Sequence, residues 1–306
     1  MPSHYLHISD HTPDSFQGLL DLAVKLKAEL RAGGNAPVLK GKILGMVFQK
    51  PSLRTRVSFD VAMRQLGGDA LYLSPAEIGL GGRESVGDVA RVLSRYVSAI
   101  MARTFSHQHV LDLARYASVP VINGLSDYNH PCQGLADLLT VQEHKGRVQG
   151  LRIAYVGDGF NVATSLWHGC ALLGANFVIA SPKGYELAAG PVETGKKLAA
   201  ATGATIELTN DPLAAVKDAD VIYTDTWTSM GQEAEAAERR KAFDGFQVNT
   251  GLLKVARPDA IVLHCLPAHR NEEITDEVMD GPQSAVFDQA ENRLHAQKAV
   301  LVSLLA

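Results

Sequence analysis

Two arginines and a serine lie in the segment Lys50-Pro-Ser-Leu-Arg-Thr-Arg56, between an apolar run at 43–48 and a helical pattern that begins at Val57. Ser52 is a predicted N-cap, because serine oxygens accept hydrogen bonds from the first amides of a helix. Those amides, the positive end of the helix dipole and the guanidinium groups would converge on one point. Such a point suits an anion with several oxygens, most naturally phosphate. The alternative is a solvated helix start with ordinary surface arginines.

Two further polar groups follow predicted structure in the first half of the chain. Arg103 ends an apolar strand, where it could reach an anion or simply form a salt bridge. In His130-Pro-Cys-Gln133, the proline suits the first turn of a helix. His130 and Gln133 could then both face a ligand, the imidazole as a donor to a carbonyl oxygen. The alternative is a capping histidine and a surface glutamine.

The glycine-rich segment Gly157-Asp-Gly-Phe-Asn-Val162 does not match a dinucleotide-binding loop. The last position of that motif requires Gly or Ala, whereas the chain has Val162. The next strand ends in Ala180-Ser-Pro-Lys183 without an acidic residue. Asn161 is therefore interpreted as a polar ligand for a small molecule, with helix capping as the alternative.

Three groups near the C-terminus complete the candidates. Asp225 ends a predicted strand before the loop Ser229-Met-Gly231, and a carboxylate there suits an ammonium group. Cys265 ends another strand, where contact with a ligand is at least as plausible as inert packing. Arg293, in the last helical pattern, would by itself pass as a surface residue.

The composition is that of an ordinary globular protein. The chain has 306 residues, of which 46% are hydrophobic and 20% charged, and its net charge of -4 does not favour nucleic-acid binding. No apolar run approaches the roughly 20 residues that span a bilayer. The N-terminal residues are not expected to act as a signal or transit peptide. Three widely spaced cysteines argue against a disulfide framework or a zinc site, so a cytoplasmic location is expected.

Strand and helix patterns alternate along the chain after a helical entry at 1–40. Predicted strands lie at 42–48, 69–74, 99–105, 119–124, 152–157, 176–181, 205–208, 220–225 and 260–265. Predicted helices include 54–67, 85–97, 107–117, 131–144 and 289–305. This alternation predicts parallel sheets with right-handed crossovers.

The predicted fold is therefore α/β, with two doubly wound parallel-sheet domains joined by a hinge at 144–150 and an active site in the cleft. The first domain is predicted to span 1–146, with the helix at 289–306 packing back on it, and the second to span 147–288. Because ligands bind beyond the carboxyl ends of strands in such sheets, the polar motifs are expected to meet there.

The motifs together resemble those of the aspartate/ornithine carbamoyltransferase superfamily, and of its ornithine branch in particular. Ser52-Leu-Arg-Thr-Arg56 is similar to the Ser-x-Arg-Thr-Arg carbamoyl-phosphate motif, and His130-Pro-Cys-Gln133 to His-Pro-x-Gln. Asp225 with Ser229-Met-Gly231 resembles the ornithine-binding Asp and loop, and His264-Cys-Leu-Pro267 the His-Cys-Leu-Pro motif. The order and spacing agree over essentially the whole chain.

The resemblance implies roles for individual residues. Those expected to bind carbamoyl phosphate are Ser52, Leu53, Arg54, Thr55, Arg103, His130, Pro131, Cys132, Gln133, Cys265, Leu266 and Arg293. Those expected to bind ornithine are Asn161, Asp225, Ser229 and Met230. The catalytic set is expected to be Arg54, Arg103, His130, Asp225 and Cys265.

The implied reaction moves the carbamoyl group of carbamoyl phosphate to the δ-amine of L-ornithine, giving L-citrulline and phosphate. The resemblance also implies a homotrimer or a multiple of trimers, with no metal or organic cofactor and no nucleic-acid or membrane partner. Another acceptor, such as putrescine or N-acetylornithine, is the nearest alternative. A dinucleotide-dependent dehydrogenase and an inactive binding protein are alternatives of a different class. The chain alone does not distinguish a role in arginine synthesis from one in arginine breakdown.

Two positions depart from the family pattern. Phe160 stands where relatives often have a second Asn, and Gly79 where many have a Gln that reaches carbamoyl phosphate from the neighbouring subunit. Arg83 has the length and charge to replace that contact. The alternative is a surface arginine paired with Glu84 or Asp88.

Overall fold

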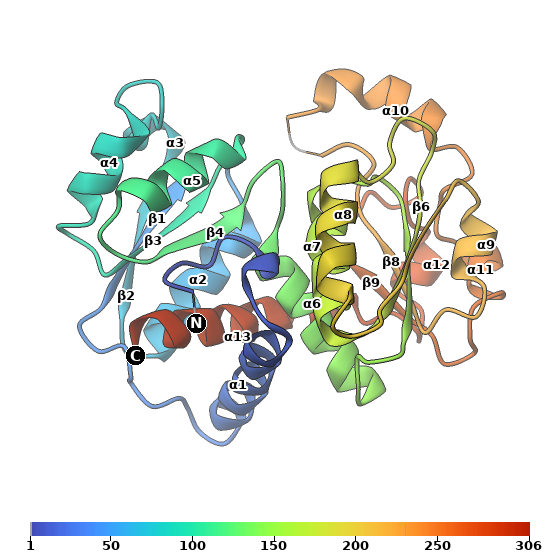
Figure 1. Cartoon of the computed structure of the whole chain (residues 1–306), viewed down its shortest axis with the longest axis horizontal. Coiled ribbons are helices and arrows are strands. Elements are labelled where there is room, and N and C mark those ends of the chain that lie inside the picture. The colour runs from blue at the N-terminus through green and yellow to red at the C-terminus, as the bar shows by residue number, and fades with distance from the viewer. Residues whose placement is uncertain (1, 230) are drawn as a thin grey trace. The chain divides into compact units, whose positions relative to one another are not determined.

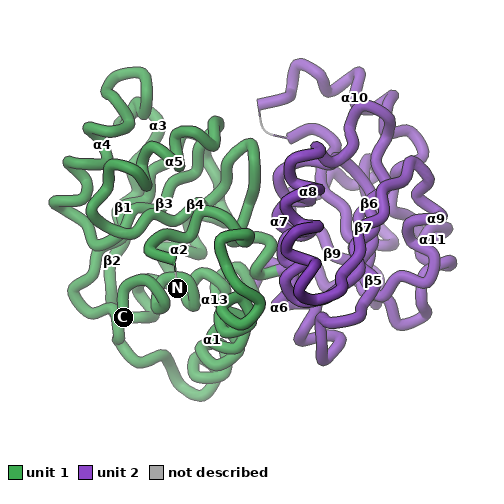
Figure 2. Tube along the Cα trace, viewed as in Figure 1, with its two compact units in different colours: residues 1–136, 292–306 green, residues 137–291 purple. Residues whose placement is uncertain are grey.

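The computed structural model describes residues 2–229 and 231–306, and the chain divides into two compact units. Unit 1 holds the residues up to Ala136 together with Asn292–Ala306, and unit 2 holds Asp137–Glu291 (Figure 2). Each unit is built on one parallel sheet, so the predicted class of two doubly wound α/β domains is confirmed.

Unit 1 has a four-stranded sheet in the order β2-β1-β3-β4. Its strands are β1 (Ile43–Phe48), β2 (Asp69–Leu73), β3 (Ala99–Arg103) and β4 (Val121–Leu125). Its helices are α1 (Pro13–Arg31), α2 (Leu53–Gln65), α3 (Pro75–Ile78), α4 (Val86–Leu93) and α5 (His107–Tyr116). Strands β1, β3 and β4 are almost entirely buried, which explains their near-continuous apolar sequences. Helices α4 and α5 lie together over one face of this sheet (Figure 1).

Unit 2 has a five-stranded sheet in the order β7-β6-β5-β8-β9. Its strands are β5 (Arg152–Val156), β6 (Asn176–Ala180), β7 (Ile206–Thr209), β8 (Val221–Thr224) and β9 (Ile261–His264). Its helices are α7 (Asn161–Leu173), α8 (Ala189–Ala199), α9 (Pro212–Val216), α10 (Ala236–Ala242), α11 (Thr250–Leu253) and α12 (Asp276–Met279). Helix α7 is buried over nearly its whole length, consistent with its apolar sequence.

Two helices contain the boundaries between the units. Helix α6 (Pro131–Lys145) contributes its first residues to unit 1, and α13 (Val286–Leu305) contributes its last residues to unit 1. The domain boundary at 146/147 stays a prediction. Among the described residues, every helix is too short or too polar to cross a membrane.

Candidate functional site

The polar residues of unit 1 follow the two strands at which its sheet changes direction. Strand β1 pairs with β3 in parallel, and Phe48 lies opposite Arg103 at their carboxyl ends. The chain extends to β2 on one side of this pair and to β4 on the other. Ligands in doubly wound sheets bind at such a switch point. The segment after β1 and the last residue of β3 therefore lie where an anion is expected.

Ser52 is the N-cap of α2, as predicted. Its hydroxyl oxygen accepts a hydrogen bond from the Thr55 amide at 3.3 Å and donates to the Thr55 hydroxyl at 3.1 Å. Thr55 is fully buried, whereas Leu53 between them has 75% of its surface exposed. The helix start is thus fixed by the cap on its inner side, and the dipole of α2 adds positive potential there.

Arg293 connects three helices that are far apart in the sequence. Its Nη1 donates to Gln133 Oε1 at 2.7 Å, and its Nη2 donates to Thr55 Oγ1 at 3.0 Å. The arginine is only 3% exposed, and both partners are buried. These contacts bring α2, the start of α6 and α13 together within unit 1.

His130 lies among several positive charges. It is 4% exposed, and its pKa is held well below 6.5, first by burial and then by the charges of Arg293, Arg103, Lys50 and Arg54. The imidazole is therefore neutral at physiological pH and can donate to a carbonyl oxygen. The concentration of cations around it favours a multiply charged anion.

Lys50 is the cation in this group that was not among the sequence-predicted site residues. It is 6% exposed, and its Nζ lies 4.8 Å from the centre of the Phe105 ring. A buried lysine against an aromatic face is held by a cation–π contact. Its place at the start of the motif Lys50-Pro-Ser-Leu-Arg-Thr-Arg56 was the available signal.

Pro131 and Cys132 begin α6 and support its first turn. The Tyr5 hydroxyl donates to the Pro131 carbonyl at 3.2 Å, and the Cys132 thiol lies 3.5 Å from the Asn123 carbonyl oxygen. Burial raises the pKa of Cys132 to about 12, so its thiol stays protonated. The side chain of Cys132 therefore contributes packing.

The loop after α3 explains the glycine at position 79. Gly79 ends α3 with φ of +49°, and a Cβ added there would lie 2.8 Å from the Cβ of Arg83. A glutamine at this position would therefore strain the loop. Arg83 Nη1 makes a weak contact with the Glu77 carbonyl at 3.4 Å, while Asp88 is paired with Arg91 at 2.9 Å. The pairing of Arg83 with Asp88 is thus not observed.

In unit 2 the polar residues also follow strands beside a switch point. Strand β5 has β6 on one side and β8 on the other, so the switch lies between β5 and β8. Gly157 follows β5, Asp225 follows β8, and Cys265 follows β9. Their place at neighbouring strand ends is the one that the sequence predicted for a ligand site.

Asp225 and Cys265 form the centre of this group. The Cys265 thiol lies 2.9 Å from Asp225 Oδ1, to which the Thr226 amide also donates at 2.7 Å. Asp225 is 7% exposed, and burial, the largest influence on its pKa, raises that pKa, although the hydrogen bonds from Cys265 and Thr226 act in the opposite direction. A buried carboxylate of this kind is prepared for a cationic ligand.

The loop after β9 is held by buried polar groups. The Leu266 amide donates to His264 Nδ1 at 2.9 Å, and Leu266 has a left-handed backbone with φ of +57°. His264 Nε2 donates in turn to Glu273 Oε1 at 2.9 Å. Glu273 therefore fixes the loop that carries Cys265 and Leu266, and it was not predicted from the sequence.

Protein backbone lies against the glycine-rich turn after β5. The Gly159 amide donates to the Tyr185 carbonyl at 2.8 Å, and a Cβ on Gly159 would lie 2.2 Å from the Leu187 amide nitrogen. The close approach of residues 185–187 thus explains this glycine. Asn161 is the first residue of α7 and is 5% exposed.

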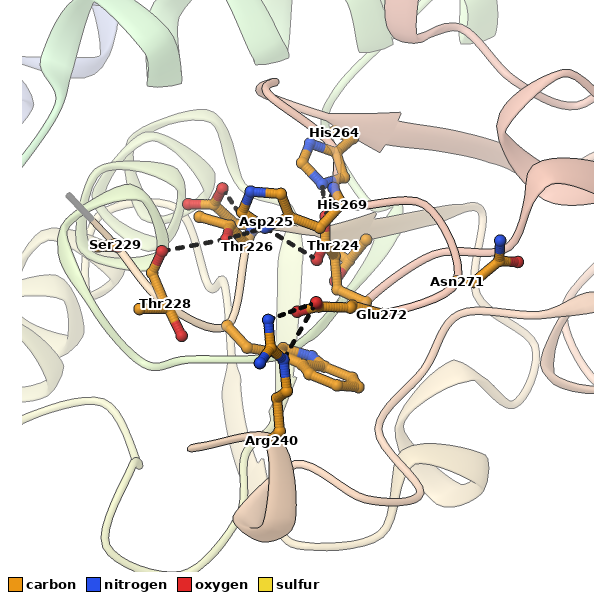
Figure 3. A network of polar contacts seen from close by, with 12 residues as sticks. Thr224, Asp225, Thr226, Thr228, Ser229, Arg240, His264, His269, Asn271 and Glu272 are labelled. Carbon is orange, nitrogen blue, oxygen red and sulfur yellow. Dashed lines mark hydrogen bonds and ion pairs between the residues drawn. The ribbon is translucent and has the colours of Figure 1, made fainter. Parts of the chain in front are cut away.

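The loop after Asp225 is only partly described. The Ser229 amide donates to Gln232 Oε1 at 3.1 Å, which turns the loop after Asp225. Met230 lies outside the described residues. Figure 3 shows Asp225, Thr226, Thr228 and Ser229 along one segment, with His264 and His269 beside it.

Comparison with known protein families identifies both halves of the chain. Residues 3–143 match the aspartate/ornithine carbamoyltransferase carbamoyl-P binding domain, and residues 149–304 match the Asp/Orn binding domain of the same family. The chain belongs to the aspartate/ornithine carbamoyltransferase family.

Individual members of this family are similar over nearly the whole length. The ornithine carbamoyltransferase of Pyrococcus abyssi is 57% identical over 98% of this chain and 95% of its own. The structure of the Pyrococcus furiosus ornithine carbamoyltransferase has a TM-score of 0.96 at 55% identity, covering 99% of this chain and 96% of that one. The Thermus thermophilus enzyme has a TM-score of 0.91 at 48% identity, with full coverage of both chains. The family resemblance predicted from the motifs is confirmed.

Proposed function

We propose that this carbamoyltransferase moves the carbamoyl group of carbamoyl phosphate to the δ-amine of L-ornithine, giving L-citrulline and phosphate. The observation that carries the proposal is the group of cations around neutral His130 at the switch point of unit 1. The relatives named ornithine carbamoyltransferase support ornithine as the acceptor.

The residues of unit 1 act on carbamoyl phosphate. Arg54 and the N-terminus of α2 stabilise the phosphate group as it leaves. Attack on the carbamoyl carbon develops negative charge on its oxygen, and Arg103, His130 and Thr55 donate to that oxygen. Because His130 is neutral in the free enzyme, one of its ring nitrogens carries a hydrogen and can donate it to that oxygen. Arg293 keeps Gln133 and Thr55 in position through its two hydrogen bonds.

The residues of unit 2 act on ornithine. Asp225, with Asn161 and Ser229, holds the amino-acid end of the substrate, and Met230 is assigned here from the sequence alone. The δ-amine must lose its proton before it attacks, although a free alkylamine has a pKa of about 10. Apolar surroundings such as Leu266 favour the neutral amine by desolvation. The departing phosphate is the proposed acceptor of the amine proton.

The remaining assignments are also proposals. The domain boundary near 146/147, the cytoplasmic location and the homotrimer follow from the sequence patterns and the family resemblance. In the trimer, the loop with Gly79 and Arg83 is proposed to reach the site of the neighbouring subunit.

A competition assay tests the acceptor. The purified enzyme is given carbamoyl phosphate with ornithine, N-acetylornithine, putrescine or aspartate, and the carbamoylated product is identified by mass spectrometry. Citrulline formation with ornithine should exceed every other product by at least about a hundredfold in kcat/KM. Preferential carbamoylation of another acceptor would contradict ornithine specificity, and no carbamoylation at all would contradict the reaction.

A further inference from the structure

Glu273 in unit 2 is a buried carboxylate whose hydrogen-bond donors are neutral. The side chain is 0% exposed, and its Oε1 accepts from His264 Nε2 at 2.9 Å and from the His269 amide at 2.6 Å. His264 accepts from the Leu266 amide through Nδ1, so the ring carries its proton on Nε2 and is uncharged. Oε2 of Glu273 accepts no hydrogen bond from the described residues. Because buried carboxylates are normally paired with a cation or a metal ion, Oε2 is suited to a positive ligand.

Two further side chains that could ligate a metal ion lie close to this oxygen. His269 Nδ1 is 3.8 Å from Glu273 Oε2, and one ligand atom each of His269, Glu272 and Glu273 lies within 4.8 Å of the others. Arg240 holds Glu272 through Oε1 at 2.9 and 3.1 Å, as Figure 3 shows. The His269 side chain is 48% exposed, so the group opens to solvent on that side.

We propose that His269, Glu272 and Glu273 form a binding site for a divalent transition-metal ion such as Zn²⁺. One imidazole with two carboxylates suits such ions. Tetrahedral zinc, with ligands at about 2.0–2.2 Å, needs ligand atoms roughly 3.3 Å apart. The spacing of 3.8 Å between His269 and Glu273 is close to this value, and the two solvent-accessible ligands can adjust. Water completes the coordination.

Metal binding at His269 would affect the segment next to Asp225. The Thr226 hydroxyl donates to the Thr228 carbonyl at 3.1 Å, so it accepts from His269 Nδ1–H at 2.9 Å. A metal ion bound at Nδ1 replaces this proton and releases Thr226. The ion would then bridge His269 and the buried Glu273 within the segment that follows β9.

A second group of possible metal ligands lies nearby, and the proposed site must be distinguished from it. One ligand atom each of Asp225, His264 and Cys265 also lies within 4.8 Å of the others. In that group the thiol already donates to Asp225, and His264 uses both ring nitrogens in hydrogen bonds. The proposed site instead contains Glu273 Oε2, which accepts no hydrogen bond from the described residues.

Zinc binding to the full-length, chelator-treated protein tests the proposal. Calorimetry at pH 7.5 should show one site whose affinity falls at least about tenfold in His269→Gln and in Glu272→Gln. Both side chains reach the surface, so the variants should fold, which circular dichroism can verify. Glu277→Gln, an exposed acidic residue of α12, and Cys265→Ser are matched controls that should keep the affinity.

Cobalt provides a spectroscopic check of the ligands. The Co²⁺ form should show d–d bands without a thiolate-to-metal charge-transfer band, because no sulfur belongs to the proposed set. The proposal is overturned by a dissociation constant for zinc weaker than about 1 mM. It is also overturned if both test variants bind as the parent does, or if a charge-transfer band appears and is lost in Cys265→Ser. The experiment uses no substrate, so its outcome is independent of the proposed activity.

Discussion

Arg54 and Arg56 are two arginines of one helix that the structure places in different surroundings. Arg54 is half-buried and contributes to the low pKa of His130, whereas Arg56 is exposed and lies over the Tyr72 ring at 4.1 Å. We expect Arg54→Ala to lower kcat/KM for carbamoyl phosphate by about a hundredfold or more, because a charge-assisted contact with the leaving phosphate is lost. Steady-state kinetics of the two alanine variants provide the measurement.

Arg56→Ala is the matched control for this prediction. It removes the same charge two positions along α2, and kcat/KM should stay within about threefold of the parent. Melting temperatures of both variants should remain close to that of the parent. Near-normal kinetics of Arg54→Ala would remove Arg54 from the phosphate site, and an equal loss in both variants would indicate only a general effect of charge.

We expect the ionised side chain of Asp225 to lower the stability of the fold while it serves the reaction with ornithine. Burial raises its pKa above 3.8, so at neutral pH the ionised form costs the folded state free energy relative to the unfolded chain. Asp225→Asn removes this charge and keeps an oxygen for the Thr226 amide. We expect a melting temperature at least as high as that of the parent, with about a hundredfold lower kcat/KM for ornithine.

Asp220, at the other end of β8, serves as a control for which we expect the opposite result. It accepts from the Arg152 amide at 2.8 Å and pairs with Arg257 at 3.1 Å. Asp220→Asn should therefore lower the melting temperature while kcat/KM for ornithine changes little. A variant Asp225→Asn that is both less stable and fully active would refute the role given to Asp225.

Some site residues could be identified from the local sequence pattern, whereas others could not. Ser52 and Asp225 follow strands and Arg103 ends one, so these three could be found from position and chemistry alone. Arg293 could be found only through the family resemblance, because nothing in its local pattern indicates contacts with Thr55 and Gln133 more than a hundred residues away. Glu273 was missed for the same reason: its burial depends on tertiary packing.

The N-terminal segment is an element that the periodicity did not reveal. Tyr5 pairs with Ile122 beside β4, and its amide donates to the Val121 carbonyl at 2.9 Å. His7 Nε2 lies 3.2 Å from His107 Nε2, and His107 Nδ1 lies 2.8 Å from the Ser126 hydroxyl. This segment therefore supports the loop that leads to His130.

Acidification should weaken this support. Burial, with a smaller contribution from His7, lowers the pKa of His107 to about 4, whereas an unfolded histidine takes up its proton near pH 6.5. Between these values the unfolded chain binds more protons, so the free energy of unfolding decreases as the pH falls. For His107 we expect the free energy of unfolding to fall by on the order of 1 kcal/mol, a value that allows for solvent screening of the partly exposed ring.

Urea unfolding at pH 7.5 and pH 5 measures this loss. His107→Gln removes the titrating ring, so the difference in unfolding free energy between the two pH values should become smaller than in the parent. An unchanged difference would exclude His107 as a source of the pH dependence.

At the level of elements, the sequence predicted most of the fold. All nine predicted strands are present, and the helices at 54–67, 107–117 and 131–144 lie within two residues of the observed ones. Buried parallel strands and amphipathic helices have strong periodic patterns, which explains this agreement. The units divide inside α6 and α13, and a continuous helical pattern carries no sign of such a division.

For the whole molecule, the proposed trimer makes the loop at Gly79 testable. Glycine has no side chain to cross a subunit boundary, and its φ of +49° disfavours any replacement. Arg83 lies in the same loop, and within the described part of the chain its guanidinium group makes a long, weak hydrogen bond to the Glu77 carbonyl at 3.4 Å. We predict that Arg83 of one subunit contacts the phosphate of its neighbour.

Mixed trimers test this directly. Arg83→Ala and Arg54→Ala subunits, each inactive alone, are combined by reversible dissociation, and mixed assembly is verified by mass. A site that takes Arg54 from one chain and Arg83 from the next is intact only where an Arg83→Ala subunit precedes an Arg54→Ala subunit. Random assembly in a cyclic trimer makes about a quarter of all sites intact, so about a quarter of the parent activity should return. If Arg83 acts within its own subunit, each site of a mixed trimer still lacks one arginine and activity stays absent. Full activity of Arg83→Ala alone, or a monomeric mass for the active parent enzyme, would equally refute a role across the interface.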